Sequence, residues 1–203
     1  MSKEHFEKRK ADILQAAKRV LMKKGFEPTT MKDIVEESGM SRGGVYQYFS
    51  SPEEMLEMLH MAHNKAFREY LDQLLRNNDS VWEALLQLVD EIDDDDNDPF
   101  GKVMYEYSVT SWRNDRHRNF MNRTADLSIQ ALHTFLKKGV EQGEFNPIQP
   151  LEAIVNFIFM INDGIILNVV VRGRDQAYTK EQLRGLKLYL RTVLQVGEKH
   201  NPS

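Results

Sequence analysis

The sequence predicts an all-α protein of about nine helices. Hydrophobic side chains recur at intervals of three and four residues through most of the 203-residue chain, which is the spacing of one helix face. Capping residues precede many of these segments, and no alternating pattern of useful length indicates a β-strand. We expect a small N-terminal domain at residues 1–50, joined by a helix at 52–76 to a larger helical domain within 51–203.

Residues 31–50 have the pattern of a helix-turn-helix. Thr30 and Asp33 have the spacing of a capping box at the start of the first helix. Gly39 stands where that helix must end in a left-handed conformation, which glycine adopts without a Cβ clash. Ser41 is the expected N-cap of the second, shorter helix.

This second helix is expected to have an apolar inner face and a polar outer face. Val45 and Phe49 are four residues apart, so they face inward together. Arginine and glutamine can form paired hydrogen bonds with bases, tyrosine can reach phosphates, and glycine lets the backbone approach DNA. The outer face therefore suits the major groove. Its residues are Arg42, Gly43, Gly44, Tyr46, Gln47 and Tyr48.

The segment from Ile13 to Leu56 resembles the N-terminal DNA-binding region of the TetR family of bacterial transcriptional regulators. The matching positions are Ile13, Leu14, Ala16, Ala17, Lys24, Gly25, Phe26, Pro28, Thr29, Thr30, Asp33, Ile34, Ser38, Gly39, Met40, Ser41, Gly43, Val45, Tyr46, Tyr48, Phe49, Glu53, Glu54, Met55 and Leu56. The chain departs from the family's usual Phe, small residue, His and Lys at Leu21, Val35, Tyr48 and Pro52.

The resemblance implies that this region binds double-stranded DNA at a palindromic operator. Arg42, Gln47 and the pair Gly43–Gly44 are expected to read or approach the bases. The residues expected to hold phosphates are Thr30, Lys32, Ser41, Tyr46 and Tyr48.

The remaining helices are expected where apolar stripes follow start signals such as Ser51 and Ser80. The run 93–98 is expected to be a solvated acidic turn, because carboxylates at a helix C-terminus oppose the helix dipole; a cation site is the alternative. A loop is expected at 172–175, and Thr179 should begin a capping box. The expected helices cover residues 2–24, 52–76, 81–92, 99–112, 120–140, 151–171 and 179–196.

Charge is distributed unevenly between the two expected parts. Residues 1–50 carry 10 Lys and Arg against 7 Asp and Glu, whereas residues 51–203 carry 17 against 24. The N-terminal part is therefore basic in a chain of net charge −4, as expected if that end meets phosphates. Chance segregation of solvated charges is the alternative.

Composition and motifs disfavour several other classes of protein. The chain has 0 Cys, which excludes disulfides and cysteine nucleophiles and fits a reducing cytoplasm. No signal-peptide pattern is found, and polar residues interrupt the apolar run 154–171, so no membrane partner is expected. His60 and His63 lack the further ligands of a zinc site. Without an enzyme motif or a phosphate-binding loop, we expect no catalytic residue, no cofactor and no metal.

Methionine and aromatic side chains are frequent in the larger domain and in the helix that leads to it. The resemblance implies a small apolar effector there, because thioethers and rings can line an adaptable pocket. Ordinary core packing is the alternative for each residue. The candidate ligand-binding residues are Met58, Met61, Met104, Tyr107, Trp112, Phe120, Phe157 and Met160.

The last two long helices are expected to pack against a second copy of the chain, as the resemblance implies; closure of a monomeric core is the alternative. Asp163 stands beside Gly164 in an apolar helix, where a lone carboxylate is unfavourable. We expect it at the dimer interface, and complementing a cationic ligand is its alternative role. The other interface candidates are Leu183, Leu186, Leu190, Val193 and Leu194.

These inferences predict a cytoplasmic, homodimeric TetR-like repressor that a small apolar effector releases from DNA. One alternative is an activator or an effector-independent member of the same family. Another, from a different class, is a helical small-molecule-binding protein or enzyme whose N-terminal part does not bind DNA.

Overall fold

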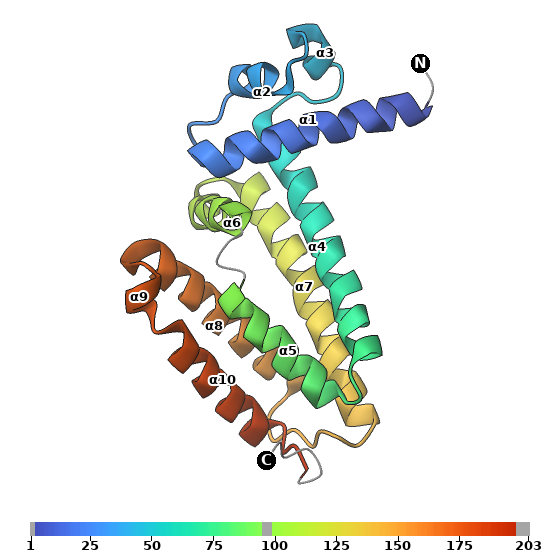
Figure 1. Ribbon diagram of the computed structural model, residues 1–203, viewed down its shortest axis with the longest axis vertical. Helices are drawn as coiled ribbons and strands as arrows, with labels where there is room; N and C mark the ends of the chain where they lie inside the picture. Colours follow the sequence, from blue (N-terminus) through green and yellow to red (C-terminus); the bar gives the residue numbers. More distant parts are fainter. Residues whose placement is uncertain (1–2, 95–98, 198–203) are drawn as a thin grey trace. The chain divides into compact units, whose positions relative to one another are not determined.

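The computed structural model describes residues 3–94 and 99–197, and every regular element within them is a helix (Figure 1). The predicted all-α fold is confirmed. The helices are α1 (Lys3–Lys24), α2 (Met31–Ser38), α3 (Arg42–Tyr46), α4 (Pro52–Asn77), α5 (Val81–Asp94), α6 (Pro99–Thr110), the 3₁₀ helix η2 (Ser111–Arg113), α7 (Asp115–Glu141), α8 (Leu151–Arg172), α9 (Arg174–Ala177) and α10 (Thr179–Val193).

Two helix ends differ from the prediction. α7 begins at Asp115 rather than near residue 120, because the side chain of Asn114 accepts hydrogen bonds from the backbone N–H groups two and three residues later, at 2.9 and 3.4 Å. α5 continues to Asp94, and residues 95–98 of the expected acidic turn lie outside the described residues.

The chain enters α10 differently from the prediction. The loop expected at 172–175 contains the start of the short helix α9, after which Tyr178 takes a left-handed conformation with φ 51°. Tyr178 is therefore the N-cap of α10 and Thr179 its first residue, so the prediction that Thr179 begins a capping box is wrong. The buried Thr179 hydroxyl has no hydrogen-bond partner among the described residues.

The chain divides into two compact units. The head unit comprises residues 1–63 and 98–122, and the body unit comprises residues 64–97 and 123–203. α4 and α7 each contribute residues to both units. The head unit extends beyond the division expected at residue 50, because α6 and the first residues of α7 pack against α1 and the start of α4.

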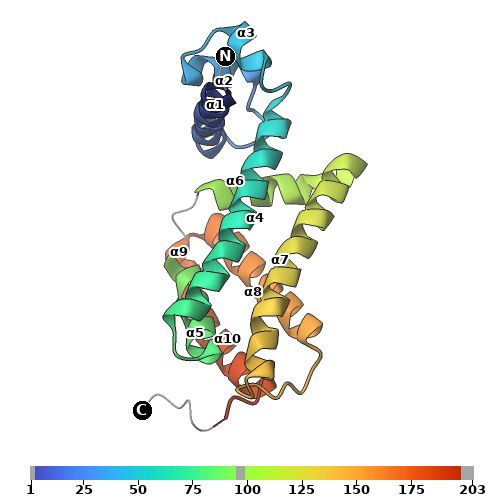
Figure 2. The same ribbon diagram turned by 90° about the vertical axis from the view of Figure 1, so that its right-hand side faces the viewer.

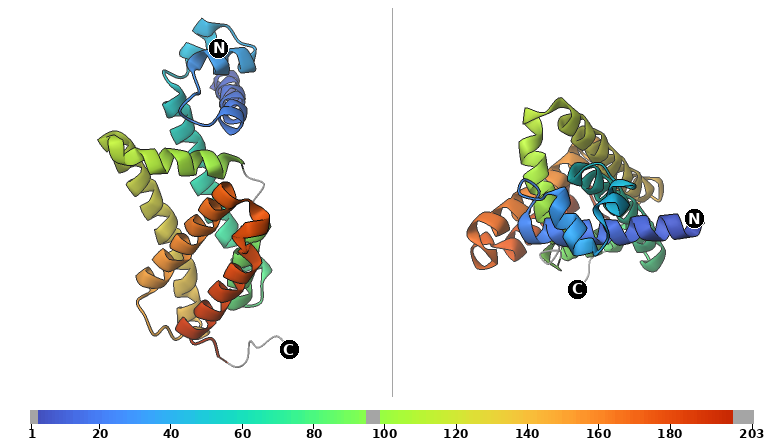
Figure 3. Two further views of the ribbon diagram at one scale, coloured as in Figure 1. Left: turned by 90° about the vertical axis from the view of Figure 1, so that its left-hand side faces the viewer. Right: turned by 90° about the horizontal axis from the view of Figure 1, so that it is seen from above.

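Two hydrophobic clusters hold the head unit together, and α1, α2 and α3 lie together in every view (Figures 1 to 3). Burying each large apolar side chain contributes about 1.5–3 kcal/mol. The cluster around the helix-turn-helix contains Ile13, Ala17, Val20, Ile34, Val45, Phe49 and Met55. The second cluster contains Leu21, Leu56, Leu59, Phe100, Val103, Met104, Tyr107 and Phe120.

In the body unit, α10 packs against α5 and α8 (Figure 3), and residues of α4 and α7 complete the core. Gly139 of α7 allows close packing, since a Cβ there would lie 2.3 Å from the ring of Phe145. The carboxylate of Glu144 accepts hydrogen bonds from the backbone N–H groups of Val81 and Trp82 at 3.0 and 3.1 Å. The free backbone N–H groups at the start of α5 are thereby satisfied by a side chain from the connection between α7 and α8.

Among the described helices, α8 has a length and an apolar composition that would permit a membrane crossing. The core helix of a soluble protein can have the same length and composition. Four of its side chains, Ile154, Val155, Ile158 and Ile165, are buried in the core of the body unit.

Candidate nucleic-acid interface

The helix-turn-helix has the local geometry that the sequence predicts. The Thr30 hydroxyl accepts a hydrogen bond from the N–H of Asp33 at 3.3 Å, and the Asp33 carboxylate accepts one from the N–H of Thr30 at 2.9 Å. Gly39 has φ 65° and ends α2. The Ser41 hydroxyl accepts a hydrogen bond from the N–H of Gly44 at 3.1 Å and so caps α3. The predicted capping box, turn and second cap are confirmed.

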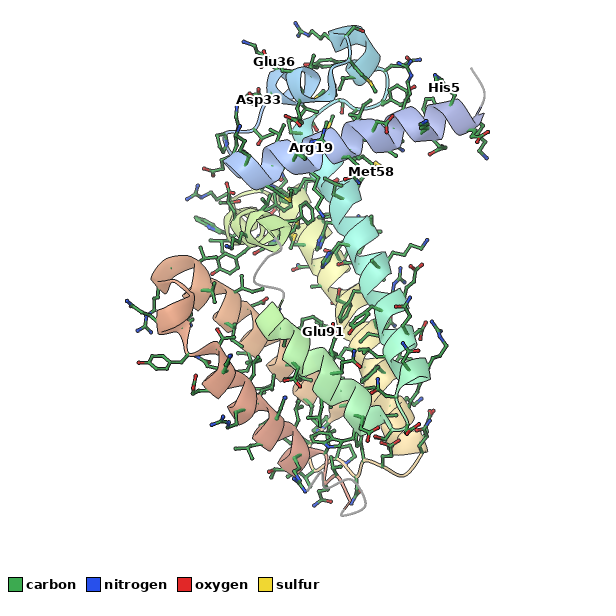
Figure 4. All side chains as sticks on the ribbon, in the orientation of Figure 1. His5, Arg19, Asp33, Glu36, Met58 and Glu91 are labelled. Carbon is green, nitrogen blue, oxygen red and sulfur yellow. The ribbon has the colours of Figure 1, made fainter. Side chains whose placement is uncertain are left out.

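The inner side of the motif is fixed to α1. Val45 is 0% exposed and Phe49 is 1% exposed, so α3 cannot rotate without losing core contacts. On the outer side, Arg19 of α1 forms a salt bridge of 2.6 Å with Glu37 of α2. Figure 4 labels Arg19 on α1 and Asp33 on α2, so the two helices joined by this contact can be followed there.

The first turn of α2 has a second anchor to α1. Lys24 forms a salt bridge with the carboxylate of Asp33, at the end of α1. The hydrogen bond from Lys24, followed by the hydrogen bonds from Thr30, lowers the pKa of Asp33 to about 2. The carboxylate thus stays ionised well below neutral pH and keeps the start of α2 in place.

Seven of the nine predicted DNA-binding residues are exposed. Thr30, Lys32 and Ser41 precede α3, whereas Arg42, Gly43, Tyr46 and Gln47 belong to α3 and its C-cap. The guanidinium of Arg42 lies over the ring of Tyr46, 5.3 Å from its centre. The helix itself is shorter than expected, because α3 ends at Tyr46 and Gln47 follows as its C-cap. Arg42, Gly43, Tyr46 and Gln47 are thus accessible along α3 and its C-cap, whereas Val45 is buried.

The other predicted DNA-binding residues have additional structural roles. Gly44 is half-buried, and a Cβ there would lie 3.1 Å from the Ser41 hydroxyl that caps α3. Thr30 is occupied in the capping box of α2. Lys32 is exposed and lies 3.8 Å from Glu36. Their contacts with DNA remain predictions.

An aromatic contact that the sequence did not indicate supports Tyr48. The ring of Phe6, near the start of α1, lies 4.6 Å from the ring of Tyr48, with 36° between the ring planes. Nearby, the ammonium of Lys10 lies 5.8 Å from the ring of Phe49. The start of α1 is therefore packed beside the end of the helix-turn-helix. The helical spacing of Phe6 predicts its burial but not its partner.

A carboxylate of α6 holds the turn between α1 and α2. The two oxygens of Glu106 accept hydrogen bonds from the backbone N–H groups of Phe26 and Glu27 at 2.9 and 3.0 Å. These residues are about 80 positions apart in the chain, and no local pattern marks Glu106 as the partner. Sequence reasoning therefore missed this residue, which positions the start of the helix-turn-helix.

A second group of polar contacts surrounds the first turn of α4. The Glu53 carboxylate lies 2.6 Å from Nε2 of His117, and it accepts a hydrogen bond from the Tyr107 hydroxyl at 3.3 Å. Arg116 donates to Glu57 at 3.3 Å. Burial, followed by the charges of Glu53 and Glu57, raises the pKa of Tyr107. These contacts link α6 and α7 to the helix that follows the helix-turn-helix.

The structure separates the eight predicted ligand-binding residues. Met104, Tyr107 and Phe120 are buried together in the head unit, whereas Met58 packs against the cluster around the helix-turn-helix. Phe157 packs against the core of the body unit. The remaining three, Met61, Trp112 and Met160, are exposed by 43%, 67% and 69%. The structure brings together three of the eight, as tightly packed core residues.

The predicted interface residues on α10 face the chain's own core. Each of them is at most 4% exposed, because α10 uses this stripe to pack against α5 and α8. The prediction that this stripe faces a second chain is therefore corrected. The residues concerned are Leu183, Leu186, Leu190, Val193 and Leu194.

On α8, the predicted interface residue Asp163 is exposed in the single chain, and its neighbour Gly164 is half-buried. Desolvation by the apolar surroundings raises the pKa of Asp163. Large apolar side chains are exposed on the same helix and on α10. They are Met160, Leu167, Val170, Val171 and Leu188.

The described residues contain no group of three or more His, Asp or Glu side chains placed to hold a metal ion. His60 and His63 both lie on α4. Burial, followed by the charge of His63, lowers the pKa of His60 to about 4, so His60 is neutral at physiological pH.

Two protein-family patterns match this chain. "Bacterial regulatory proteins, tetR family" matches residues 13–59, and "Tetracyclin repressor-like, C-terminal domain" matches residues 80–180. The chain is 44% identical over 208 aligned residues to the uncharacterized HTH-type transcriptional regulator YfiR of Bacillus subtilis, covering 98% of each chain. It is 24% identical over 137 residues to the HTH-type transcriptional regulator QacR of Staphylococcus aureus, covering 67% of this chain and 73% of that protein.

Solved structures share the fold over nearly the whole chain. A TetR transcription regulator from Haloarcula marismortui has a TM-score of 0.79 at 17% identity, covering 93% of this chain and 100% of that one. A regulator from Saccharomonospora viridis, solved with choline, has a TM-score of 0.75 at 19% identity, covering 91% of this chain and 96% of that one. FadR of Bacillus subtilis, solved with stearoyl-CoA, has a TM-score of 0.69 at 19% identity, covering 87% of this chain and 96% of that one.

Proposed function

This chain belongs to the TetR family of bacterial regulatory proteins, and we propose that it is a cytoplasmic, homodimeric repressor that a small effector releases from a palindromic operator. The chain is a DNA-binding regulator of transcription. The proposal adds the sign of regulation, the assembly, the form of the operator and the mode of release.

One observation carries the proposal: the exposed polar face of α3 stands on a helix-turn-helix whose inner face is buried. Arg42 and Gln47 are accessible to base edges, while Val45 and Phe49 hold the helix on α1. Bidentate contacts from Arg to guanine and from Gln to adenine each discriminate bases by about 1–3 kcal/mol. A rigid support lets these side chains read bases without a large loss of conformational entropy.

Exposed apolar side chains on α8 and α10 support assembly into a dimer. Met160, Val171 and Leu188 are exposed by 69%, 70% and 64% in the single chain. A second copy would remove them from water, together with Asp163 and Gly164. Two recognition helices in one dimer would then read the two halves of a palindrome.

Release by an effector is proposed from the behaviour of other proteins of this fold and from the continuity of α4. Relatives in fold have been solved with choline, stearoyl-CoA and lauroyl-CoA. α4 is one helix from Pro52 to Asn77, so it connects the end of the helix-turn-helix with the body unit. An effector that binds one conformation of the body more tightly lowers operator affinity by that difference in binding free energy.

The proposed function is tested by selecting binding sequences from random duplex DNA at two salt concentrations. We expect a palindrome to be enriched, with affinity that falls steeply as salt rises, because lysine and arginine contacts with phosphates release counterions. Repression is then measured with a reporter gene behind the selected palindrome. A lack of enrichment at low salt would contradict DNA reading by the free protein, and increased reporter expression would contradict repression.

A further inference from the structure

A groove runs between α4 and α7 in the body unit, where the two helices can be followed in Figure 2. It has a volume of about 290 Å³ and adjoins a second hollow of about 320 Å³. Asp72, Leu75 and Lys138 line both, so the two hollows are neighbours. None of the eight ligand-binding residues predicted from sequence lines either of them.

The floor of the groove is apolar. Leu71 and Phe135 are buried, and Leu75, Leu127 and Ala131 are half-buried. The residues of α7 in this set follow one another at intervals of four, so they form one stripe along the helix. From residue 127 to 135 this stripe extends over about 12 Å at 1.5 Å per residue. Such a floor matches a hydrocarbon chain laid along the helix.

The rim of the groove is polar and carries a net positive charge. The rim of the first hollow carries two cations, Arg68 and Lys138, and one carboxylate, Asp72. The second hollow adds one cation, Arg76, and one carboxylate, Asp79. Arg68 forms no ion pair with any residue in the part of the chain that the structure describes. Lys138 lies 4.0 Å from Asp72, at the outer limit of a salt bridge. One cation is therefore left without a compensating carboxylate.

We propose that the α4–α7 groove binds the effector, and that the effector is an anionic amphiphile with a hydrocarbon chain and a carboxylate head. The chain lies over Leu71, Leu127 and Phe135, and the carboxylate is held by Arg68 and Lys138. This inference rests on the proposed function, in which a ligand of the body releases DNA. It replaces the uncharged apolar effector expected from sequence with a charged one.

The position of the groove also explains how its ligand acts. Arg68 and Leu71 lie on the same uninterrupted helix as Glu53 and Glu57, whose polar contacts hold the start of α4 in the head unit. A ligand that separates α4 from α7 changes the position of α4, and the ligand favours the conformation that has room for it. Release from DNA then follows from differential binding, with no contact between ligand and DNA.

The charge of the ligand is tested with three probes that share one hydrocarbon chain: decanoate, decanol and decyltrimethylammonium. Each is titrated into the full chain by calorimetry, below the concentration at which micelles form. We expect decanoate to bind at least about tenfold more tightly than the other two, because only its head forms charge-assisted hydrogen bonds with the rim. Equal binding of the three probes overturns the proposed charge.

The location is tested with variants of the rim. Arg68→Gln and Lys138→Gln should each weaken decanoate binding about tenfold, the effect expected when a hydrogen-bonded charge is removed. Lys137→Gln is the matched control, since Lys137 is exposed on α7, pairs with Glu141 at 3.6 Å and does not line the groove. Gln130→Trp covers the groove from an exposed position without changing its charge and should abolish binding. Circular dichroism confirms that each variant is folded. Equal affinity of the Arg68, Lys138 and Lys137 variants overturns the site.

Binding to the selected DNA, measured on the same preparations, separates this inference from the proposed function. DNA binding without decanoate binding overturns the ligand inference and leaves the regulator intact. Decanoate binding without DNA binding overturns the proposed function and leaves the ligand site intact. Decanoate binding that leaves DNA affinity unchanged overturns the role of the groove in release, whereas a decrease in DNA affinity that Arg68→Gln suppresses supports both.

Discussion

Gly25 lies so close to Glu106 that a Cβ at residue 25 would stand 2.7 Å from an oxygen of the Glu106 carboxylate. Gly25 also has φ 83°, a conformation that other residues adopt only with strain. The two requirements coincide where α1 ends and the chain turns toward α2. The same carboxylate accepts the backbone hydrogen bonds of Phe26 and Glu27, so the turn is shaped by its glycine and held by α6.

Removing this carboxylate should destabilise the head unit. Glu106→Ala leaves the partly buried N–H of Phe26 without its acceptor, and we expect a loss of about 1–3 kcal/mol in the free energy of unfolding. Urea denaturation measures the loss, with Lys102→Ala, an exposed substitution on α6, as the control. Unfolding midpoints that agree between the two variants would show that the contact contributes nothing.

Gly25→Ala should destabilise the chain as well, by about 1–2 kcal/mol for the left-handed backbone plus the effect of the close contact with Glu106. In the background of Glu106→Ala the close contact disappears and only the backbone strain remains. The double variant should therefore lose less stability than the sum of the two single variants. Strictly additive losses in a double-mutant cycle would contradict the close approach.

Base-reading and phosphate-holding residues should differ in how they affect DNA binding. Arg42→Ala should weaken binding to the selected operator by about 1–3 kcal/mol and relax its sequence preference. Lys32→Ala should weaken binding to all sequences alike and reduce the dependence of affinity on salt by about one phosphate contact. Fluorescence anisotropy with operator and scrambled duplexes measures both. Unchanged operator affinity in the Arg42 variant would mean that another residue reads the bases.

Asp33 should make the stability of the head unit depend on pH. Its pKa in the folded chain is about 2, below the ordinary 3.8, so its ionised form stabilises the fold. This stabilisation is present above about pH 4 and is lost as the pH falls through about 2. Asp33→Asn should thus be less stable than the native chain at pH 7, with a difference that shrinks below pH 4. Denaturation of both proteins across this pH range tests the prediction, with the exposed substitution Asp12→Asn as control. A difference in the free energy of unfolding that stays constant with pH would contradict the role of the charge.

Leu190 and Leu188 stand two residues apart on α10 and should have opposite roles. Leu190 is 0% exposed, so Leu190→Ala should lower the free energy of unfolding by about 2–5 kcal/mol. Leu188 is 64% exposed, so Leu188→Asp should leave the fold intact and weaken dimerisation. Denaturation and light scattering after gel filtration measure the two effects. A Leu188 variant that remains fully dimeric at low concentration would place the interface elsewhere.

The helix-turn-helix was predictable in detail because its determinants are local. The capping box of Thr30 and Asp33, the left-handed Gly39 and the cap at Ser41 all involve residues at most four positions apart. The start of α10 was predicted wrongly for the complementary reason. Thr179 has the sequence pattern of a cap, but the preceding short helix α9 brings the chain in through Tyr178.

The sequence by itself determined the fold class, the position of the helix-turn-helix and the family, because periodicity, caps and turns depend on neighbouring residues. Only the tertiary structure decided what the buried face of α10 packs against, that Glu106 holds a turn 80 residues earlier, and that Arg68 and Lys138 line one groove. An apolar stripe specifies burial without specifying a partner, since hydrophobic attraction is not directional. Contacts between distant segments depend on the packing of the whole unit. The charge of the proposed ligand site could therefore be inferred only from the folded structure.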